Sequence, residues 1–418
     1  MKKIRFAAFA LFFLIAPILV LPMCYAADAL KPYPIEMEGT ISNLKSCNYN
    51  EAFQLSDDFV KLTIDSNKSK QNNHLALLER GKVALTAGNY DQCITDLQAA
   101  ERRFLTTEGT ISLTEGFGSL LTDDTAQEYE AEMHEKLMIS PYLILAYLSK
   151  GDFNGAKVER NHTITKINQY IEENPDERAY LENPFARYLT AIMYEMENKK
   201  DDAKIEYKKL KMNQEIARIG SKKGKTTDLV ILVDVGLAPQ KTQLKWGPMP
   251  ITVDNETISL GFAYASYATT PTETTTCDIY LDEKSLGNAN LLYDLDNTII
   301  TQHEKNKSVL ITKLVARMTA KASVQFAAQK AATEVAKNIP FGGLLKAAVS
   351  VAGAIWMAVE HADLRSWITL PKQIKYLRIN ELAPGEHTIK IDFGCGIQER
   401  KIKLEKDKIG VAYFAFAK

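Results

Sequence analysis

Hydrophobic positions recur with a helical period over the first half of the chain and with a period of two over much of the second half. The clearest helical stretch runs from Leu77 to Ala100, where apolar or small residues have the spacing of two short antiparallel helices that bury one face against each other. These positions are Leu78, Gly81, Ala84, Gly88, Tyr90, Cys93, Leu97 and Ala100. The pattern predicts a helix pair, which supplies a binding surface rather than a reaction.

This helix pair resembles a tetratricopeptide repeat, and less regular copies surround it. Small residues stand at equivalent positions of the copies, at irregular intervals rather than a constant spacing of about 34 residues. They are Ala52, Cys93, Ala156 and Ala203. We therefore expect a degenerate TPR-like α-solenoid over residues 27–217, with its largest insertion at Thr107 to Asp124.

Stacked helix pairs leave a concave groove that is lined by the first helix of each pair. The polar and aromatic residues that we expect to line this groove are Arg80, Tyr142, Arg187 and Tyr188. For each of them taken singly, we favour a role in packing or a solvated position over a place in the groove. A groove of this kind would bind a protein or an envelope component.

The hydrophobic period changes to two beyond residues 218–227, a charged, glycine-containing stretch that we interpret as a linker. Strands are predicted at 228–235, 242–246, 257–265, 277–281, 373–379, 388–393, 399–404 and 410–416, with a turn at Gly247 to Pro250 among others. Alternation from His387 to Phe393 indicates one buried face and one wet face, as in an antiparallel sandwich. We expect a multidomain α+β protein in which residues 228–418 form an Ig-like β-sandwich.

A helical insertion interrupts the predicted sandwich at about residues 296–361. Its first helical segment ends near a proline and two glycines at Asn338 to Gly343, and the second contains an apolar stretch that is shorter than the roughly 20 residues needed to span a bilayer. We expect a helical hairpin packed on the sandwich. Peripheral membrane contact through Leu344 to Val359 is the alternative.

The N-terminus carries basic residues before an apolar run from Phe6 to Met23, which predicts a signal peptide at residues 1–26. A retained anchor helix and a lipid attached to Cys24 are the alternatives. The large side chain of Met23 stands where a lipoprotein peptidase prefers a small one, which disfavours the lipid anchor. We expect a periplasmic or secreted protein associated with the cell envelope.

Lysine and arginine number 51 against 52 aspartates and glutamates, so the chain has no basic footprint for nucleic acid. Cysteines that remain after signal removal favour disulfides in an oxidising compartment. We expect the pairs Cys47–Cys93 and Cys277–Cys395, because each pair stays inside one predicted domain. For Cys93, a small core residue at the alanine position of the repeat is the alternative.

The sequence NLLYDLDNTII, with Asp294 and Asp296, resembles the first motif of the haloacid dehalogenase phosphohydrolases. In that superfamily the first aspartate is the nucleophile and the second an acid/base, beside Mg²⁺. The predicted elements that follow have a different order, so we interpret both aspartates as caps of the coming helix. The histidines lack the paired spacing of a zinc site, and we expect no metal and no cofactor.

Four phrases of the chain, SPYLILAYLSKGDFNGAKVER, NPFARYLTAIMYE, VDVGLAPQK and ADLRSWITLPKQIKYLRI, are similar to segments of a family of bacterial cell-envelope proteins. Members of that family have N-terminal TPR-like repeats and a β-rich C-terminal part, and many are lipoproteins. The resemblance runs from about Ser140 to the C-terminus and implies no catalytic residue. We therefore expect a non-enzymatic envelope scaffold, with a Mg²⁺-dependent phosphohydrolase using Asp294 and Asp296 as the alternative.

Overall fold

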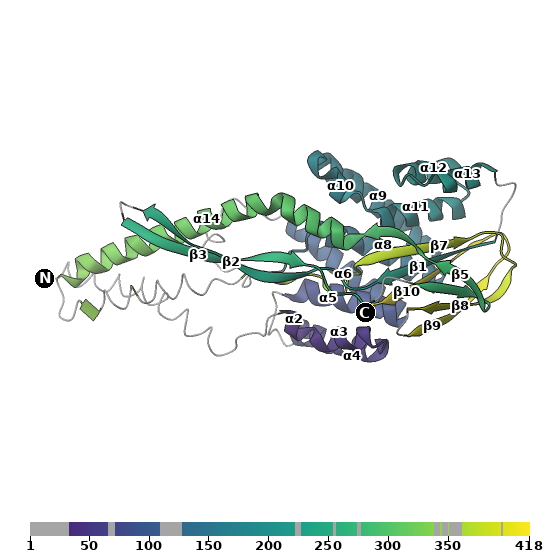
Figure 1. The fold of residues 1–418 in the computed structure, drawn as a ribbon, viewed down its shortest axis with the longest axis horizontal. Helices are drawn as coiled ribbons and strands as arrows, with labels where there is room; N and C mark the ends of the chain where they lie inside the picture. The colour runs from purple at the N-terminus through teal and green to yellow at the C-terminus, as the bar shows by residue number, and fades with distance from the viewer. Residues whose placement is uncertain are drawn as a thin grey trace.

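The computed structural model describes residues 33–65, 72–108, 128–221, 227–253, 256–273, 277–337, 343–344, 350, 362–393 and 396–418. Within these residues the chain is α+β, as the sequence predicts. Helices and two four-stranded sheets form a body, and a long arm projects from it (Figure 1). The signal peptide with Cys24, Cys395 and nearly all of the segment Leu344 to Val359 lie outside the described residues.

Antiparallel helix pairs in the N-terminal half are joined by one recurring turn. Cys47, Gly88, Gly151 and Asn198 each adopt a positive φ, between 60° and 81°, within two residues of the end of a helix. The N–H of the following residue then bonds to a carbonyl near the end of the first helix, which is a Schellman-type C-cap. The pairs are α3 (Glu38–Lys45) with α4 (Tyr49–Val60), α5 (Asn73–Ala87) with α6 (Tyr90–Glu108), α8 (Met133–Lys150) with α9 (Phe153–Glu173), and α11 (Pro184–Met196) with α12 (Lys200–Lys209).

The small residues expected at equivalent packing positions, Ala52, Cys93, Ala156 and Ala203, are fully buried in the second helix of each pair. Shorter helical segments flank the pairs: α2 (Tyr33–Glu36), a π-helical turn (Lys61–Asp65), a 3₁₀ turn (Pro175–Glu177), α10 (Arg178–Leu181) and α13 (Asn213–Ser221). The first residues of the predicted linker, 218–221, therefore belong to a helix.

Two sheets pack face to face, and one of them, the inner sheet, also packs against the helices. The inner sheet has the strand order β10-β1-β7-β6 and the outer sheet the order β5-β4-β8-β9. Their strands are β1 (Asp228–Val235), β4 (Asp278–Leu281), β5 (Lys284–Asn288), β6 (Asn290–Asp294), β7 (Gln373–Ile379), β8 (Gly385–Asp392), β9 (Ile397–Leu404) and β10 (Ile409–Phe416). Strands β5 and β6 were not predicted. The pair β1–β10 is parallel, which corrects the expectation of a purely antiparallel sandwich.

Strand β1 is buried along its whole length. Leu229, Ile231 and Val233 lie in the hydrophobic cluster between the two sheets. Val230 and Leu232, on the opposite face of the strand, belong to the cluster that the inner sheet shares with the helices. The run of consecutive apolar residues in β1 follows from this burial on both faces. One core thus joins the two regions that the sequence separates at residues 218–227.

Asp234 of β1 is also buried, and it faces the helices. It pairs with Lys82 of α5 at 3.0 Å. It also accepts hydrogen bonds from the hydroxyls of Tyr142 at 2.8 Å and Tyr413 at 2.7 Å. A buried carboxylate is tolerated only when it is paired and hydrogen-bonded, as here. Near the other end of β1, Arg378 of β7 binds Asp228 in the same way, at 2.7 Å.

The arm consists of the hairpin β2 (Gln240–Val253) and β3 (Glu256–Ala268) together with the helix α14 (Leu295–Ala336). Strand β2 continues through Gly247 to Pro250, where the sequence predicted a turn, because a register shift between Trp246 and Met249 absorbs these residues. Hairpin and helix extend side by side away from the body (Figure 1).

Helix α14 has 42 residues, about 63 Å at the usual helical rise. Leu314, Met318 and Ala322 pack against Phe262 of β3. We expected the first helix of the insertion to pack on the sandwich, but much of it packs on the hairpin. The reason is that β3 runs along the helix and packs Phe262 and Tyr264 against it.

Replacing Lys82 by methionine leaves Asp234 buried without its cation, and we expect a loss of about 3–5 kcal/mol in the free energy of unfolding. Denaturant unfolding of the full chain measures this loss. Lys150→Met is the matched control, because its partner Asp91 is exposed and little change is expected there. Equal stability of the two variants would contradict a structural role for the buried pair.

Candidate functional site

The inner faces of the helix pairs are covered by the chain itself. Residues 366–369 run into a turn, and backbone N–H groups of this segment donate to two fully buried carboxylates. Glu135 of α8 accepts from Trp367 N at 2.6 Å, and Glu79 of α5 accepts from Ile368 N at 2.8 Å and Thr369 N at 3.2 Å. Burial raises the pKa of Glu79 to about 7, although these donors act in the opposite direction.

Two of the expected groove residues, Tyr142 and Tyr188, are completely buried. Tyr142 of α8 binds Asp234, as described above. Tyr188 of α11 packs against Tyr376 of the inner sheet, with ring centroids 4.9 Å apart. Both side chains thus join the first helices of their pairs to the sheet.

The two expected groove arginines are held by carboxylates within the helical layer. Arg80 makes a bidentate contact with Asp96 of α6, at 2.7 Å for each nitrogen. Arg187 binds Glu182 at 2.8 Å and Glu206 at 3.2 Å, and it is 2% exposed. We therefore correct the expectation that Arg80, Tyr142, Arg187 and Tyr188 line an open groove: the sheet and the segment before β7 occupy the inner side of the helices.

The predicted Cys47–Cys93 disulfide is not formed, since both residues are free thiols. Cys277 is a free thiol as well, and its predicted partner Cys395 lies outside the described residues. Cys93 packs inside the helical core. Cys47 occupies the turn before α4 and packs instead against the cluster between the sheets. Membership of one predicted domain did not predict the pairing, because Cys47 and Cys93 pack in different hydrophobic clusters.

Asp294 and Asp296 make hydrogen bonds that stabilise the fold. Asp294 is the N-cap of α14 and accepts from Asn297 N at 3.1 Å. Asp296 is buried, and it accepts a hydrogen bond from the Thr269 hydroxyl. Asp294 thus has the capping role that we favoured for both residues, and Asp296 is tied to the end of the hairpin.

A cavity of about 430 Å³ lies where the arm meets the body. Its walls come from the start of α8, the segment around α10, both strands of the hairpin and the first half of α14. The lining residues are Glu132, Met133, Glu177, Tyr180, Lys241, Ala263, Tyr264, Ala265, Ile299, Gln302, His303, Asn306, Leu310, Leu314, Arg317, Ala362 and Asp363. The lining thus combines aliphatic and aromatic surface with a few polar groups, as is common for binding sites.

Two charged residues of the cavity wall, Lys241 and Glu132, pair with each other. Lys241 of β2 contacts Glu132 at 2.6 Å, and Glu132 also accepts from the Tyr267 hydroxyl at 2.8 Å. Burial raises the pKa of Glu132, but the Lys241 ammonium outweighs it and holds this pKa at about 2. The pair therefore leaves no uncompensated charge to attract a strongly charged ligand.

Two neighbouring side chains of α14 have a buried nitrogen without a hydrogen-bond partner in the described part of the chain: Gln302 Nε2 and His303 Nε2. Gln302 is only 9% exposed. Burial lowers the pKa of His303, so its ring is neutral at neutral pH and each nitrogen can act as either donor or acceptor, depending on the tautomer. Such unpaired groups are costly in a folded protein and call for a partner.

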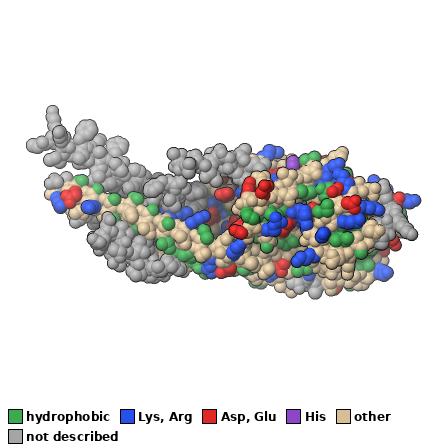
Figure 2. All heavy atoms as spheres, turned by 90° about the horizontal axis from the view of Figure 1, so that it is seen from above, with side chains coloured by type: hydrophobic (Ala, Val, Ile, Leu, Met, Phe, Trp, Pro, Cys, Tyr) green, Lys and Arg blue, Asp and Glu red, His purple; other side chains and the backbone are tan. Residues whose placement is uncertain are grey.

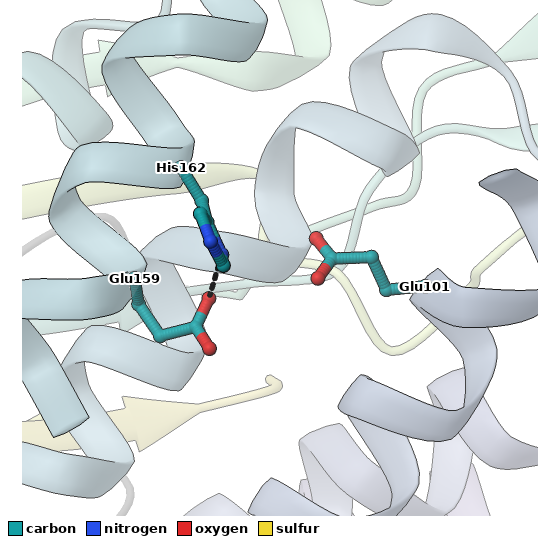
Figure 3. Close-up of side chains that lie close together, drawn as sticks. All are labelled: Glu101, Glu159 and His162. Carbon is teal, nitrogen blue, oxygen red and sulfur yellow. Dashed lines mark ion pairs between the residues drawn. The ribbon is translucent and has the colours of Figure 1, made fainter.

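A second cluster lies between helices α6 and α9. Oxygen or nitrogen ligand atoms of Glu101, Glu159 and His162 are all within 4.8 Å of one another. Figure 3 shows Glu159 and His162 side by side on one helix, with the carboxylate of Glu101 facing them from another. Burial, and then the charge of Glu101, raises the pKa of Glu159.

The sequence indicates part of the cluster between α6 and α9, but it does not indicate the cavity residues Gln302 and His303. Glu159 and His162 are three residues apart, which places them on one face of a helix, and a search for paired histidines overlooks that spacing. Glu101 comes from a different helix pair, so its approach depends on the packing of α6 near α9. Gln302 and His303 carry no recognisable motif, because their importance arises from burial beside the hairpin.

Comparison of the chain with models of protein families, with curated proteins and with solved structures finds no match. Among the described residues, no helix combines the length and the apolar character that a membrane crossing requires. The functional argument therefore depends on the geometry of the chain itself.

The Asp294 contacts predict different effects for two substitutions. Asp294→Asn keeps an N-cap side chain, whereas Asp294→Ala removes it and should cost about 1 kcal/mol of stability. Neither variant should change the background rate of hydrolysis of a generic phosphoester with Mg²⁺. Thermal unfolding and a phosphatase assay measure the two quantities. Mg²⁺-dependent hydrolysis that is lost in Asp294→Asn would instead support the phosphohydrolase.

Proposed function

We propose that this protein is a non-enzymatic scaffold of the bacterial cell envelope that binds an extended peptide segment of a partner protein in the cavity at the root of its arm. The observation that carries this proposal is that Gln302 and His303, which line a cavity of about 430 Å³, each have a buried nitrogen without a partner among the described residues. The proposal keeps the binding role that the sequence favours and moves it from the repeat groove to the arm.

A peptide fits the chemistry of this cavity better than a charged small molecule does. Its backbone offers both donors and acceptors to the amide of Gln302 and the neutral ring of His303. Its side chains can cover apolar lining residues such as Leu310 and Leu314. In addition, the hairpin is a two-stranded sheet in the described residues, so an edge of β3 is available for an added strand.

The surface charge agrees with a partner of mixed character. Figure 2 shows basic and acidic side chains interspersed over the described face of the body, while the arm on this face carries mostly apolar and uncharged groups. A nucleic acid or another polyanion would require a surface of one sign. Neither the described part of this face nor the overall balance of 51 basic and 52 acidic residues indicates such a surface.

We also propose that the helix pairs are TPR-like, that the two packed sheets are Ig-like, and that the protein acts in the periplasm or after secretion. The recurring turn at Gly88, Gly151 and Asn198 supports a common origin of the pairs. The basic and apolar N-terminal sequence supports export. In this arrangement the repeats form the base that holds the arm, and the arm presents the binding site.

Site-specific photo-crosslinking in the envelope of a producing cell tests the site. A photoreactive residue at position 306, on the cavity wall, should form an adduct with a partner protein. The same residue at exposed position 208 of α12 should form none. A synthetic peptide from the crosslinked segment should compete with the adduct at position 306. Equal adducts at both positions, or none at 306, would reject the cavity as the binding site.

Gln302→Leu separates binding from folding. Removing an unpaired buried amide should leave the free energy of unfolding unchanged or raise it by about 1 kcal/mol. The same change should weaken adduct formation at position 306, because the peptide loses a hydrogen-bond partner. Gln329→Leu, farther along α14, is the matched control. A clear destabilisation by Gln302→Leu would mean that the amide has a structural role instead.

A further inference from the structure

The cluster of Glu101, Glu159 and His162 lies outside the proposed peptide site and has a feature that packing alone does not explain. Glu159 is 3% exposed, yet its Oε2 atom has no hydrogen-bond partner among the residues described. Its other oxygen accepts from Gln98 Nε2 at 3.3 Å. His162 Nδ1 is 3.7 Å from Oε2, which is too long for a hydrogen bond.

We propose that Glu101, Glu159 and His162 form a binding site for a divalent transition-metal ion, with Zn²⁺ as the representative. A buried carboxylate oxygen without a donor, an exposed imidazole and a second carboxylate converge on the same point (Figure 3). Carboxylate oxygens and imidazole nitrogens are both protein ligands of zinc, and sites with three protein ligands leave a fourth position for water.

The mixed ligand set discriminates between classes of metal ion. Ca²⁺ takes six to eight oxygen ligands and Mg²⁺ prefers oxygen in an octahedral shell, whereas imidazole suits Zn²⁺ and its neighbours. Ligand atoms around one Zn²⁺ ion stand about 3.4 Å apart, given bonds of about 2.1 Å. The present separations of up to 4.8 Å therefore have to shrink. The side chain of His162 is 54% exposed and is free to move inward.

Lys166 is the group that competes with the metal ion. Its ammonium contacts Glu101 Oε1, which also accepts from Ser140 Oγ at 3.3 Å. Binding of the ion displaces this ammonium or shifts Glu101 away from it. Because Glu101 belongs to α6 and the other ligands to α9, the ion links two neighbouring helix pairs.

Calorimetric titration of the untagged full chain with Zn²⁺ tests the site. We expect one ion per chain, a rise in the thermal unfolding temperature with Zn²⁺ and no response to Ca²⁺. His162→Ala and Glu159→Gln should each weaken Zn²⁺ binding at least about tenfold. Glu172→Gln, an exposed carboxylate of the same helix, is the matched control and should bind as the unmodified protein does.

Lys166→Met gives the most specific result. Removal of the competing ammonium should tighten Zn²⁺ binding, whereas ion capture by an isolated surface histidine would not respond to this change. Since His162 is exposed, His162→Ala should fold normally even if Glu159→Gln does not. Zn²⁺ binding that is unchanged in His162→Ala, or no binding to the unmodified chain, would overturn the proposal. Neither result bears on peptide binding at the arm.

Discussion

Burial of strand β1 on both faces is the constraint on which the rest of the structure depends. Its apolar residues can be covered from both sides only if the helices lie on one face of the inner sheet and the outer sheet on the other. The two aspartates of the strand then require partners inside the molecule. Lys82 of the helical layer binds Asp234, and Arg378 of the neighbouring strand β7 binds Asp228. The Lys82–Asp234 pair thus joins the inner sheet to the helices by charge as well as by packing.

In this arrangement the inner face of the helix pairs is covered by the sheet and by the segment before β7. In an isolated solenoid of helix pairs, the first helices would line an open groove. Here Glu79 and Glu135 bind the backbone of the segment that leads into β7, and Tyr142 and Tyr188 contact the sheet. Other parts of the same chain thus occupy the face that would otherwise bind a ligand. Among the described residues, surfaces that remain for other molecules include the arm, the cavity at its root and the outer side formed by helices such as α6 and α9.

The sequence predicts the elements of this fold better than their assembly. Helix pairs and most strands follow from the periods of hydrophobic positions, and β1 could be placed to the residue. The short strand β5 was missed because only one of its five residues is even partly buried, and the Gly247 to Pro250 stretch was taken for a turn because a bulge has the same composition. Polar residues on the first helices suggested a groove. Only the packing of the sheet shows that those residues are bound internally.

The candidate sites were harder to predict because they depend on which buried polar groups remain unpaired. Glu79 accepts hydrogen bonds at both of its oxygens, whereas Asp234 makes its contacts through Oδ2 and its Oδ1 has no partner among the described residues. Other buried atoms, such as the Tyr188 hydroxyl, also lack a partner among the described residues, and that one lies within packed core. Gln302 and His303 differ because their unpaired nitrogens belong to residues that line a cavity. Glu159 differs because its free oxygen faces two further ligands. Both proposals therefore start from an unpaired group on a residue that lines a cavity or faces other ligands, whereas an unpaired group in packed core indicates only a local cost.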